Sequence, residues 1–221
     1  MLNMQLDRAV AINTRKMEWE ASPCPGVWRK PLARESAEQG HTTSIVKYDA
    51  GAEFSAHQHP YGEEILVLDG VFSDEHGDYP AGTYLRNPPG SSHSPFSHQG
   101  CILLVKLDQF DQFDHESVRI DTHRTAWLPG NDNLEIMLLH DFGLESVVML
   151  KYPAGTRLRP HQHFGGEEFF VVSGEVFDEY GEYPAGTWVR SPHNSEHCRY
   201  VEQETIVWLK TGHLTPANRL S

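Results

Sequence analysis

The same sequence pattern occurs twice in this chain, at a constant distance of 104 residues. Residues 50–107 align with residues 154–211 without a gap, and both copies contain HQH, GEE and DE-x-G-x-YPAGT. A repeat of this length is too long for a solenoid unit and indicates two homologous domains. We place these domains at residues 1–112 and 113–221, with a polar, acidic connector at their boundary.

A second match lies upstream of the first one. Residues 9–19 (AVAINTRKMEW) resemble residues 117–127 (SVRIDTHRTAW), so each domain begins with a similar arm. Short apolar runs rich in β-branched residues alternate with Gly, Pro, Asp and Asn, and no helical stripe of apolar residues is evident. The pattern predicts an all-β fold in which each domain is a sandwich or a closed barrel. Asp74–Gly77 and Asp178–Gly181 are expected to be hairpin turns.

Charge and cysteine content exclude several classes of protein. The chain has 31 acidic and 18 basic residues, a net charge of −13, and no long basic cluster, so we expect no nucleic-acid partner. Three scattered cysteines do not make a disulfide framework. No apolar run is long enough to cross a membrane and no signal peptide is evident, so we expect a cytoplasmic protein without a membrane partner.

Histidines and carboxylates recur at the same spacing in both copies. His57 and His59 are two positions apart, which places both imidazoles on one face of a strand. Glutamates follow at positions 63 and 64, and His93 comes one hairpin later. The second copy has His161, His163, the pair Glu167-Glu168, and His197.

Three imidazoles and one carboxylate form a donor set for a borderline divalent cation. A single H-x-H pair occurs often without a metal, but the whole set is kept in both copies although neighbouring residues differ. We therefore predict one metal site in each domain. Adjacent residues of a strand face opposite sides, so one glutamate of each pair joins the histidines and the other faces solvent or a salt-bridge partner.

The spacing of these residues resembles the two motifs of the cupin family. The first copy contains Gly51-x5-His57-x-His59-x3-Glu63-x6-Gly70 and Gly82-x5-Pro88-x-Gly90-x2-His93. The second copy keeps every one of these positions except Gly90, where Asn194 stands. The resemblance implies a bicupin: two antiparallel jelly-roll barrels in tandem, each with one metal in its mouth. It also favours Glu63 and Glu167 as the carboxylate ligands.

Residues 72–93 are similar to the cupin half of ChrR-type anti-sigma factors. In that family the positions of His57, His59, Glu63 and His93 bind zinc, and the domain makes the regulator responsive to singlet oxygen and related oxidants. The resemblance implies zinc as the first choice of metal. It also implies a sensor or regulatory module for oxidative stress, with a sigma factor or another regulatory protein as partner, but without the separate sigma-binding domain.

Similar cupins also occur among metal-dependent dioxygenases that cleave small ketones. The alternative is therefore a mononuclear dioxygenase with a small-molecule ligand in the barrel mouth and iron(II), manganese or nickel as the metal. Arg86 and Arg190 occupy matching positions on the strands that lead to the third histidine. They are predicted either to anchor an anionic substrate or to pair with Asp74 and Asp178 across the hairpin. A homodimer is a further expectation.

Overall fold

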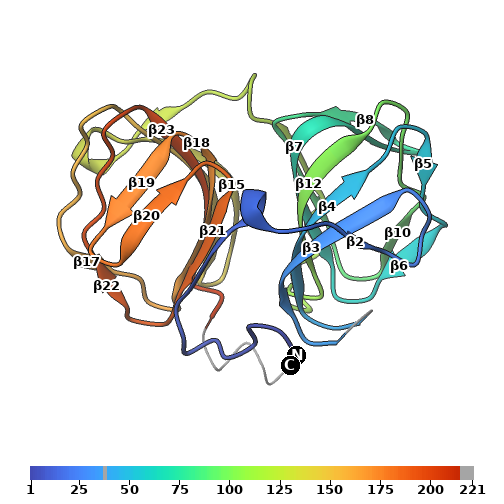
Figure 1. Cartoon of the computed structure of the whole chain (residues 1–221), viewed down its shortest axis with the longest axis horizontal. Coiled ribbons are helices and arrows are strands. Elements are labelled where there is room, and N and C mark those ends of the chain that lie inside the picture. Colours follow the sequence, from blue (N-terminus) through green and yellow to red (C-terminus); the bar gives the residue numbers. More distant parts are fainter. Residues whose placement is uncertain (37–38, 215–221) are drawn as a thin grey trace. The chain divides into compact units, whose positions relative to one another are not determined.

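The computed structural model describes residues 1–36 and 39–214. These residues form two compact units of β-strands (Figure 1). The first unit, called here the first barrel, contains Met1–Met4 and Met17–Thr125. The second unit, the second barrel, contains Gln5–Lys16 and the residues from Ala126 onward. Both helical segments within the described ranges are three-residue 3-10 turns, and neither has the length that crossing a bilayer requires.

The large sheet of the first barrel has the strand order β13-β9-β7-β12-β4-β3-β2. Strands β5, β8 and β11 pair beside this path, and β6 pairs with β10. The strands are β2 (Glu20–Ala21), β3 (Val27–Arg34), β4 (Thr42–Tyr48), β5 (Ala52–Glu53), β6 (His57–His59), β7 (Glu63–Asp74), β8 (Gly77–Pro80), β9 (Thr83–Asn87), β10 (Ser91–His93), β11 (Phe96–Ser97), β12 (Cys101–Leu107) and β13 (Val118–Asp121).

The second barrel repeats this topology with the order β1-β21-β18-β23-β16-β15-β14, together with the pairs β17-β22 and β19-β20. Its elements are β1 (Val10–Asn13), η1 (Thr14–Lys16), β14 (Leu128–Pro129), η2 (Asn131–Asn133), β15 (Glu135–Phe142), β16 (Glu145–Tyr152), β17 (His161–Gln162), β18 (Glu167–Ser173), β19 (Glu175–Asp178), β20 (Gly181–Pro184), β21 (Thr187–Ser191), β22 (Glu196–His197) and β23 (Thr205–Thr211). The predicted all-β fold and both hairpin turns are confirmed.

The arms that precede the two repeats are exchanged between the barrels. Strand β1 belongs to the first repeat but pairs with β21 of the second barrel, with Val10 opposite Arg190. Strand β13 belongs to the second repeat but pairs with β9 of the first barrel, with Val118 opposite Arg86. Each compact unit therefore contains an edge strand from the other repeat, and the predicted boundary near residue 112 describes the sequence repeats rather than these units.

Each barrel has its own apolar core. In the first barrel, alternate residues of the long strands face inward and bury Ile65, Val67, Leu85 and Leu103 at 1 % exposure or less. In the second barrel, Phe169, Val171, Val189 and Val207 are buried at 5 % or less. Burial of one such side chain stabilises the fold by about 1.5–3 kcal/mol. These cores support the short strand pairs β6-β10 and β17-β22, which carry the histidines.

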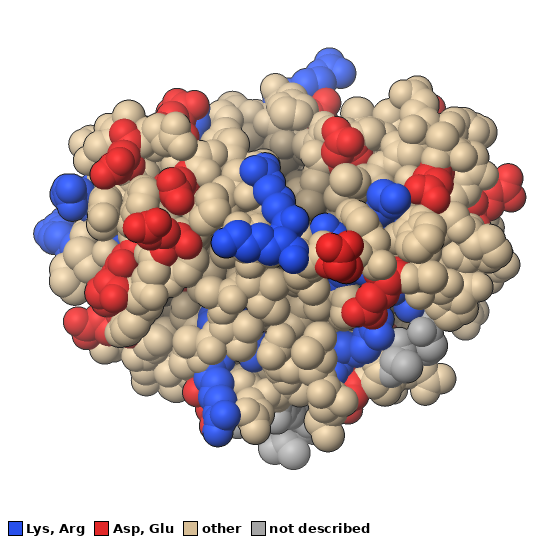
Figure 2. Space-filling model, viewed as in Figure 1, with Lys and Arg blue, Asp and Glu red and all other residues tan. Residues whose placement is uncertain are grey.

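Charged side chains cover the molecule unevenly. On the face in Figure 2, acidic side chains are scattered and the basic ones form small groups. Phosphate backbones bind to broad basic surfaces, and this face offers none among the residues described. The absence of a nucleic-acid partner stays a prediction.

Candidate metal centres

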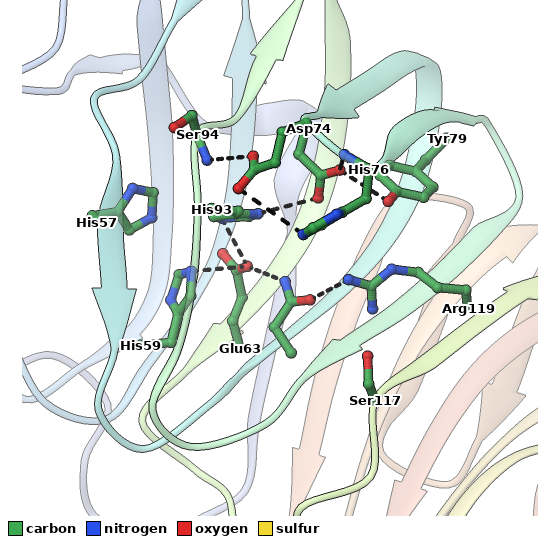
Figure 3. Close-up of polar contacts among 12 residues, drawn as sticks. His57, His59, Glu63, Asp74, His76, Tyr79, His93, Ser94, Ser117 and Arg119 are labelled. Atoms are coloured by element: carbon green, nitrogen blue, oxygen red, sulfur yellow. Dashed lines mark hydrogen bonds and ion pairs between the residues drawn. The ribbon is translucent and has the colours of Figure 1, made fainter.

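The first histidine cluster comprises His57, His59, Glu63 and His93, whose ligand atoms all lie within 4.8 Å of one another. Glu63 Oε2 is 3.3 Å from His59 Nε2 and 3.4 Å from His93 Nε2 (Figure 3). Three of these four residues are buried, and His57 is partly exposed. The structure thus brings together the four residues that the sequence predicts as ligands in this domain.

Local backbone geometry explains how these residues meet. His57 and His59 lie on the same face of β6, and the antiparallel partner β10 places His93 opposite His57. Gly62 turns the chain between β6 and β7 with a φ of +82°, and a Cβ there would lie 2.5 Å from the Phe110 ring. A glycine is required at this turn for both reasons.

Outer contacts orient the ligand side chains. The Ser55 carbonyl accepts a hydrogen bond from His57 Nδ1 at 2.8 Å, which leaves Nε2 as the free acceptor. Asp74 Oδ2 lies 3.5 Å from His93 Nδ1, and the opposite ring nitrogen faces Glu63 (Figure 3). Such carboxylate–histidine pairs fix the ring and raise its basicity toward a metal.

Glu63 also has a polar support. Asn87 Nδ2 donates to Glu63 Oε2 at 2.8 Å, and Arg119 Nη2 donates to Asn87 Oδ1 at 2.5 Å. Arg119 lies on the exchanged strand β13, so an arm of the second repeat completes the surroundings of the first cluster (Figure 3). Sequence reasoning did not find Asp74, Asn87 or Arg119 as partners of the ligands.

The protonation state of the cluster suits a metal. Burial lowers the pKa of His59 to about 4, and the neighbouring His57 acts in the same direction. Burial also lowers the pKa of His93. Nε2 of both residues is buried and has no hydrogen-bond partner among the residues described. Neutral imidazoles with unsatisfied, converging nitrogen atoms are the state that a divalent cation binds, so the residues present fit a metal.

A cavity of about 910 Å³ opens onto this cluster. His57, His59 and Glu63 form part of its wall, and the rest combines apolar side chains such as Phe54 and Leu103 with polar and charged ones such as Arg29. This volume and lining are those of a site for a small organic molecule.

The second histidine cluster comprises His161, His163 and His197, again with ligand atoms within 4.8 Å of one another. The Arg159 carbonyl lies 2.9 Å from His161 Nδ1, as the Ser55 carbonyl does in the first barrel. His197 Nε2 is 3.1 Å from His161 Nε2. Each domain therefore contains a histidine cluster with the spacing of metal ligands.

Glu167 approaches these histidines but has a stronger partner. Its Oε2 lies 3.1 Å from His163 Nε2, and its Oε1 lies 3.6 Å from His197 Nδ1. The Arg199 guanidinium binds both carboxylate oxygens, with Nη1–Oε2 at 3.1 Å and a short Nη2–Oε1 contact. Burial alone would raise the pKa of Glu167, but the charge and hydrogen bonds of Arg199 outweigh it and lower the pKa to about 2.

Sequence reasoning missed Arg199. The equivalent position of the first repeat is Pro95, so the ligand pattern that the two repeats share does not include Arg199. The difference itself was the available indication, since a cation two positions after a ligand histidine changes the charge of the site.

The second glutamate of each pair faces the other side of its sheet. Glu64 accepts a hydrogen bond from the Tyr84 hydroxyl at 2.8 Å and lies 3.6 Å from Arg86 Nη1. Glu168 accepts from Trp188 Nε1 at 3.2 Å and lies 3.4 Å from His213 Nε2. The structure therefore brings Glu63 and Glu167 to the histidines, and Glu64 has the salt bridge that was one of the two expectations.

The two strand arginines are fully buried. Arg86 pairs with Glu64 and, at 2.5 Å, with Asp114, so the expected pairing with Asp74 is wrong because Asp74 supports His93 instead. Arg190 donates to the Gln5 carbonyl at 3.3 Å. The predicted role of Arg86 and Arg190 in substrate binding stays a prediction, and their burial gives it no support.

Two consecutive antiparallel barrels, each with a histidine cluster on short paired strands, define a bicupin. The sequence profile of the ChrR cupin-like domain matches residues 7–111 and again residues 115–215. The chain therefore belongs to the ChrR cupin-like family, with two such domains in tandem, and both the predicted resemblance and the predicted bicupin fold are confirmed.

Solved structures with the same fold share little sequence with this chain. A Nostoc punctiforme protein proposed to be a dioxygenase is 13 % identical, with a TM-score of 0.78 over 96 % of this chain and 86 % of its own. Lactobacillus farciminis oxalate decarboxylase in a formate complex is 13 % identical, with a TM-score of 0.64 over 93 % and 86 %. An Escherichia coli pirin in complex with nickel(II) is 12 % identical, with a TM-score of 0.66 over 92 % and 98 %. Among curated protein sequences, none matches the chain.

Proposed function

We propose that the chain is a metal-dependent enzyme that acts on a small, largely apolar organic molecule in the first barrel, most simply as a dioxygenase of a ketone-like substrate. The observation that carries this proposal is the cavity of about 910 Å³ whose wall includes three residues of the first histidine cluster. A metal site with a purely structural role is closed by its ligands, whereas a catalytic site keeps room for a second molecule.

His57, His59, Glu63 and His93 would hold the metal, with iron(II) as the metal that suits this reaction. When bound, it would supply Lewis acidity and the one-electron chemistry that reaction with O2 requires. The apolar part of the wall, which includes Phe54 and Leu103, would hold the carbon skeleton beside the cluster. Both oxygen atoms of one O2 would enter the two fragments of the cleaved carbon–carbon bond, so the substrate supplies all electrons and no external reductant is needed.

The test combines metal analysis with oxygen uptake. Protein purified without added metal is analysed for iron, manganese, nickel and zinc, then mixed with small diketones in an oxygen electrode. We expect oxygen uptake that requires iron(II) and is lost in His93→Ala but kept in His98→Ala, a control on an exposed histidine outside the cluster. Zinc as the bound metal, or no oxygen uptake with the iron-loaded protein, would contradict the proposal.

A variant of the cavity separates substrate binding from metal binding. Leu103 lines the cavity, and Val207 is its equivalent in the second barrel. Leu103→Phe is expected to raise KM or abolish turnover without lowering the metal content, because it fills space next to the cluster. Val207→Phe is the matched control, and an equal loss with both variants would speak against a substrate site in the first barrel.

Family membership favours a second candidate, a zinc-dependent sensor of oxidative stress that binds a sigma factor. In that case the protein would contain zinc and consume no oxygen. It would also form a complex with an extracytoplasmic-function sigma factor. Gel filtration would detect this complex, and removal of the zinc would dissociate it.

A further inference from the structure

The two histidine clusters differ in the partner of their carboxylate. We propose that Arg199 takes the place of the metal in the second barrel, so that the chain binds one divalent cation, in the first barrel. This inference rests on the proposed metal site at His57, His59, Glu63 and His93, and it assigns no metal chemistry to the second barrel.

The contact between Arg199 and Glu167 is built like a permanent pair. Both side chains are almost completely buried, at 3 % and 0 % exposure, and the guanidinium meets the carboxylate through two parallel contacts. Such a fork geometry matches the two carboxylate oxygens and leaves little of their charge for another cation. A divalent ion that entered the second cluster would also face the positive charge of Arg199 at short range in a poorly hydrated site.

A second difference between the repeats is an aromatic ring that holds the Arg199 side chain in place. Its guanidinium lies 4.2 Å from the centre of the Phe169 ring, a cation–π contact. The equivalent positions in the first barrel are Pro95 and Ile65, which supply neither a cation nor an aromatic ring. The arginine and the ring that it stacks on thus occur together in one repeat and are both missing from the other.

The polar support of the first barrel is missing from the second one. Asn87, which donates to Glu63, is replaced by Ser191 at the equivalent position. His161 and His197 contact each other through Nε2 at 3.1 Å, so one of them carries the proton of a hydrogen bond. Nε2 of His163 has no hydrogen-bond partner among the described residues, as is also true of His59 and His93 in the first cluster, so the difference between the clusters lies in the His161–His197 contact and in Arg199.

The test counts metal equivalents with Co²⁺, whose visible spectrum reports the ligand set. Metal-free full-length protein is titrated in equilibrium dialysis, together with the variants His93→Ala and His197→Ala. We expect one tight equivalent in the wild type, its loss in His93→Ala and its retention in His197→Ala. Two tight equivalents, one of which is lost in His197→Ala, would overturn the inference and leave the proposed function standing. No bound Co²⁺ in the wild type would contradict the proposed function itself.

Arg199→Met tests the role of the arginine directly, and Arg199→Lys is the matched control that keeps the charge. Release of Glu167 is expected to create a second Co²⁺ equivalent in Arg199→Met, at least ten-fold tighter than any second equivalent of the wild type. The Arg199→Lys variant should still bind one tight equivalent of Co²⁺. If Arg199→Met does not fold without metal, recovery of its circular dichroism spectrum by Co²⁺, and not by Mg²⁺, reports the same site. No second equivalent in a folded Arg199→Met protein contradicts the inference.

Discussion

The two barrels position their histidines in the same way but neutralise their carboxylates differently. Glu63 in the first barrel faces two imidazoles and the Asn87 amide, all of which are neutral donors or acceptors. Glu167 in the second barrel faces a guanidinium. A conserved set of metal ligands is therefore not by itself evidence of equal metal sites, because one residue beyond the set can supply the positive charge that the metal would bring.

The largest effect is expected on the stability of the second barrel. Arg199→Met leaves Glu167 buried without its cation, and loss of one partner of a buried pair costs about 3–5 kcal/mol. The double variant with Glu167→Gln should recover much of this loss, because the uncompensated charge is gone. Denaturant unfolding of the metal-free proteins measures the free energy of unfolding of both variants. If Arg199→Met loses less than about 1 kcal/mol of it, Arg199 does not supply the buried positive charge that we assign to it.

Acid should destabilise the metal-free protein. The pKa of His59 is about 4 in the folded state against 6.5 as its ordinary value, so the unfolded state binds more protons between these limits. The free energy of unfolding is therefore highest above pH 6.5, where His59 is neutral in both states. It falls as the pH falls, by about 2 kcal/mol at pH 5 from His59 alone. Urea unfolding at several pH values from 7 to 5 checks this. In His59→Gln, the free energy of unfolding is expected to depend less on pH. An unchanged slope in the variant would contradict it.

Asp74 and its equivalent Asp178 separate the two sites at the level of supporting residues. Asp74→Asn weakens the partner of His93 and should lower the Co²⁺ affinity of the first barrel about 10–100-fold. Asp178→Asn should leave the Co²⁺ affinity as it is, since both aspartates bind the tyrosine hydroxyl and the backbone of their hairpins, but among the described residues only Asp74 also contacts the third histidine of its cluster. Equal losses with both variants would remove the distinction between the barrels.

The smallest effect is expected from the exchanged arm. Arg119 holds the Asn87 amide in the orientation that donates to Glu63, so Arg119→Ala should lower the Co²⁺ affinity by less than about 10-fold. Arg124→Ala, an exposed arginine just beyond the same strand, is the control. If Arg119→Ala changes the stability of the protein but not its Co²⁺ affinity, Arg119 supports the sheet and not the metal ligands.

The sequence alone was sufficient to predict the fold and the candidate ligands, because the strand pattern is local and the ligand spacing occurs twice. It could not reveal the exchange of β1 and β13, since the two arms are similar in sequence and nothing in either one indicates which sheet edge it joins. It also could not find Asp114 as the partner of Arg86, 28 residues away, which only the folded chain brings together. The role of Arg199 could have been predicted from the sequence. However, a difference between two repeats looks like ordinary divergence unless the positive charge of the arginine is considered.

The most direct test of the account is anomalous diffraction from crystals of the wild-type protein grown with Co²⁺, with data collected at the cobalt absorption edge. We predict one strong anomalous peak, bounded by His57, His59, Glu63 and His93, and no comparable peak beside His161, His163 and His197. Peaks of equal height in both barrels, or a peak in the second barrel alone, would contradict the account.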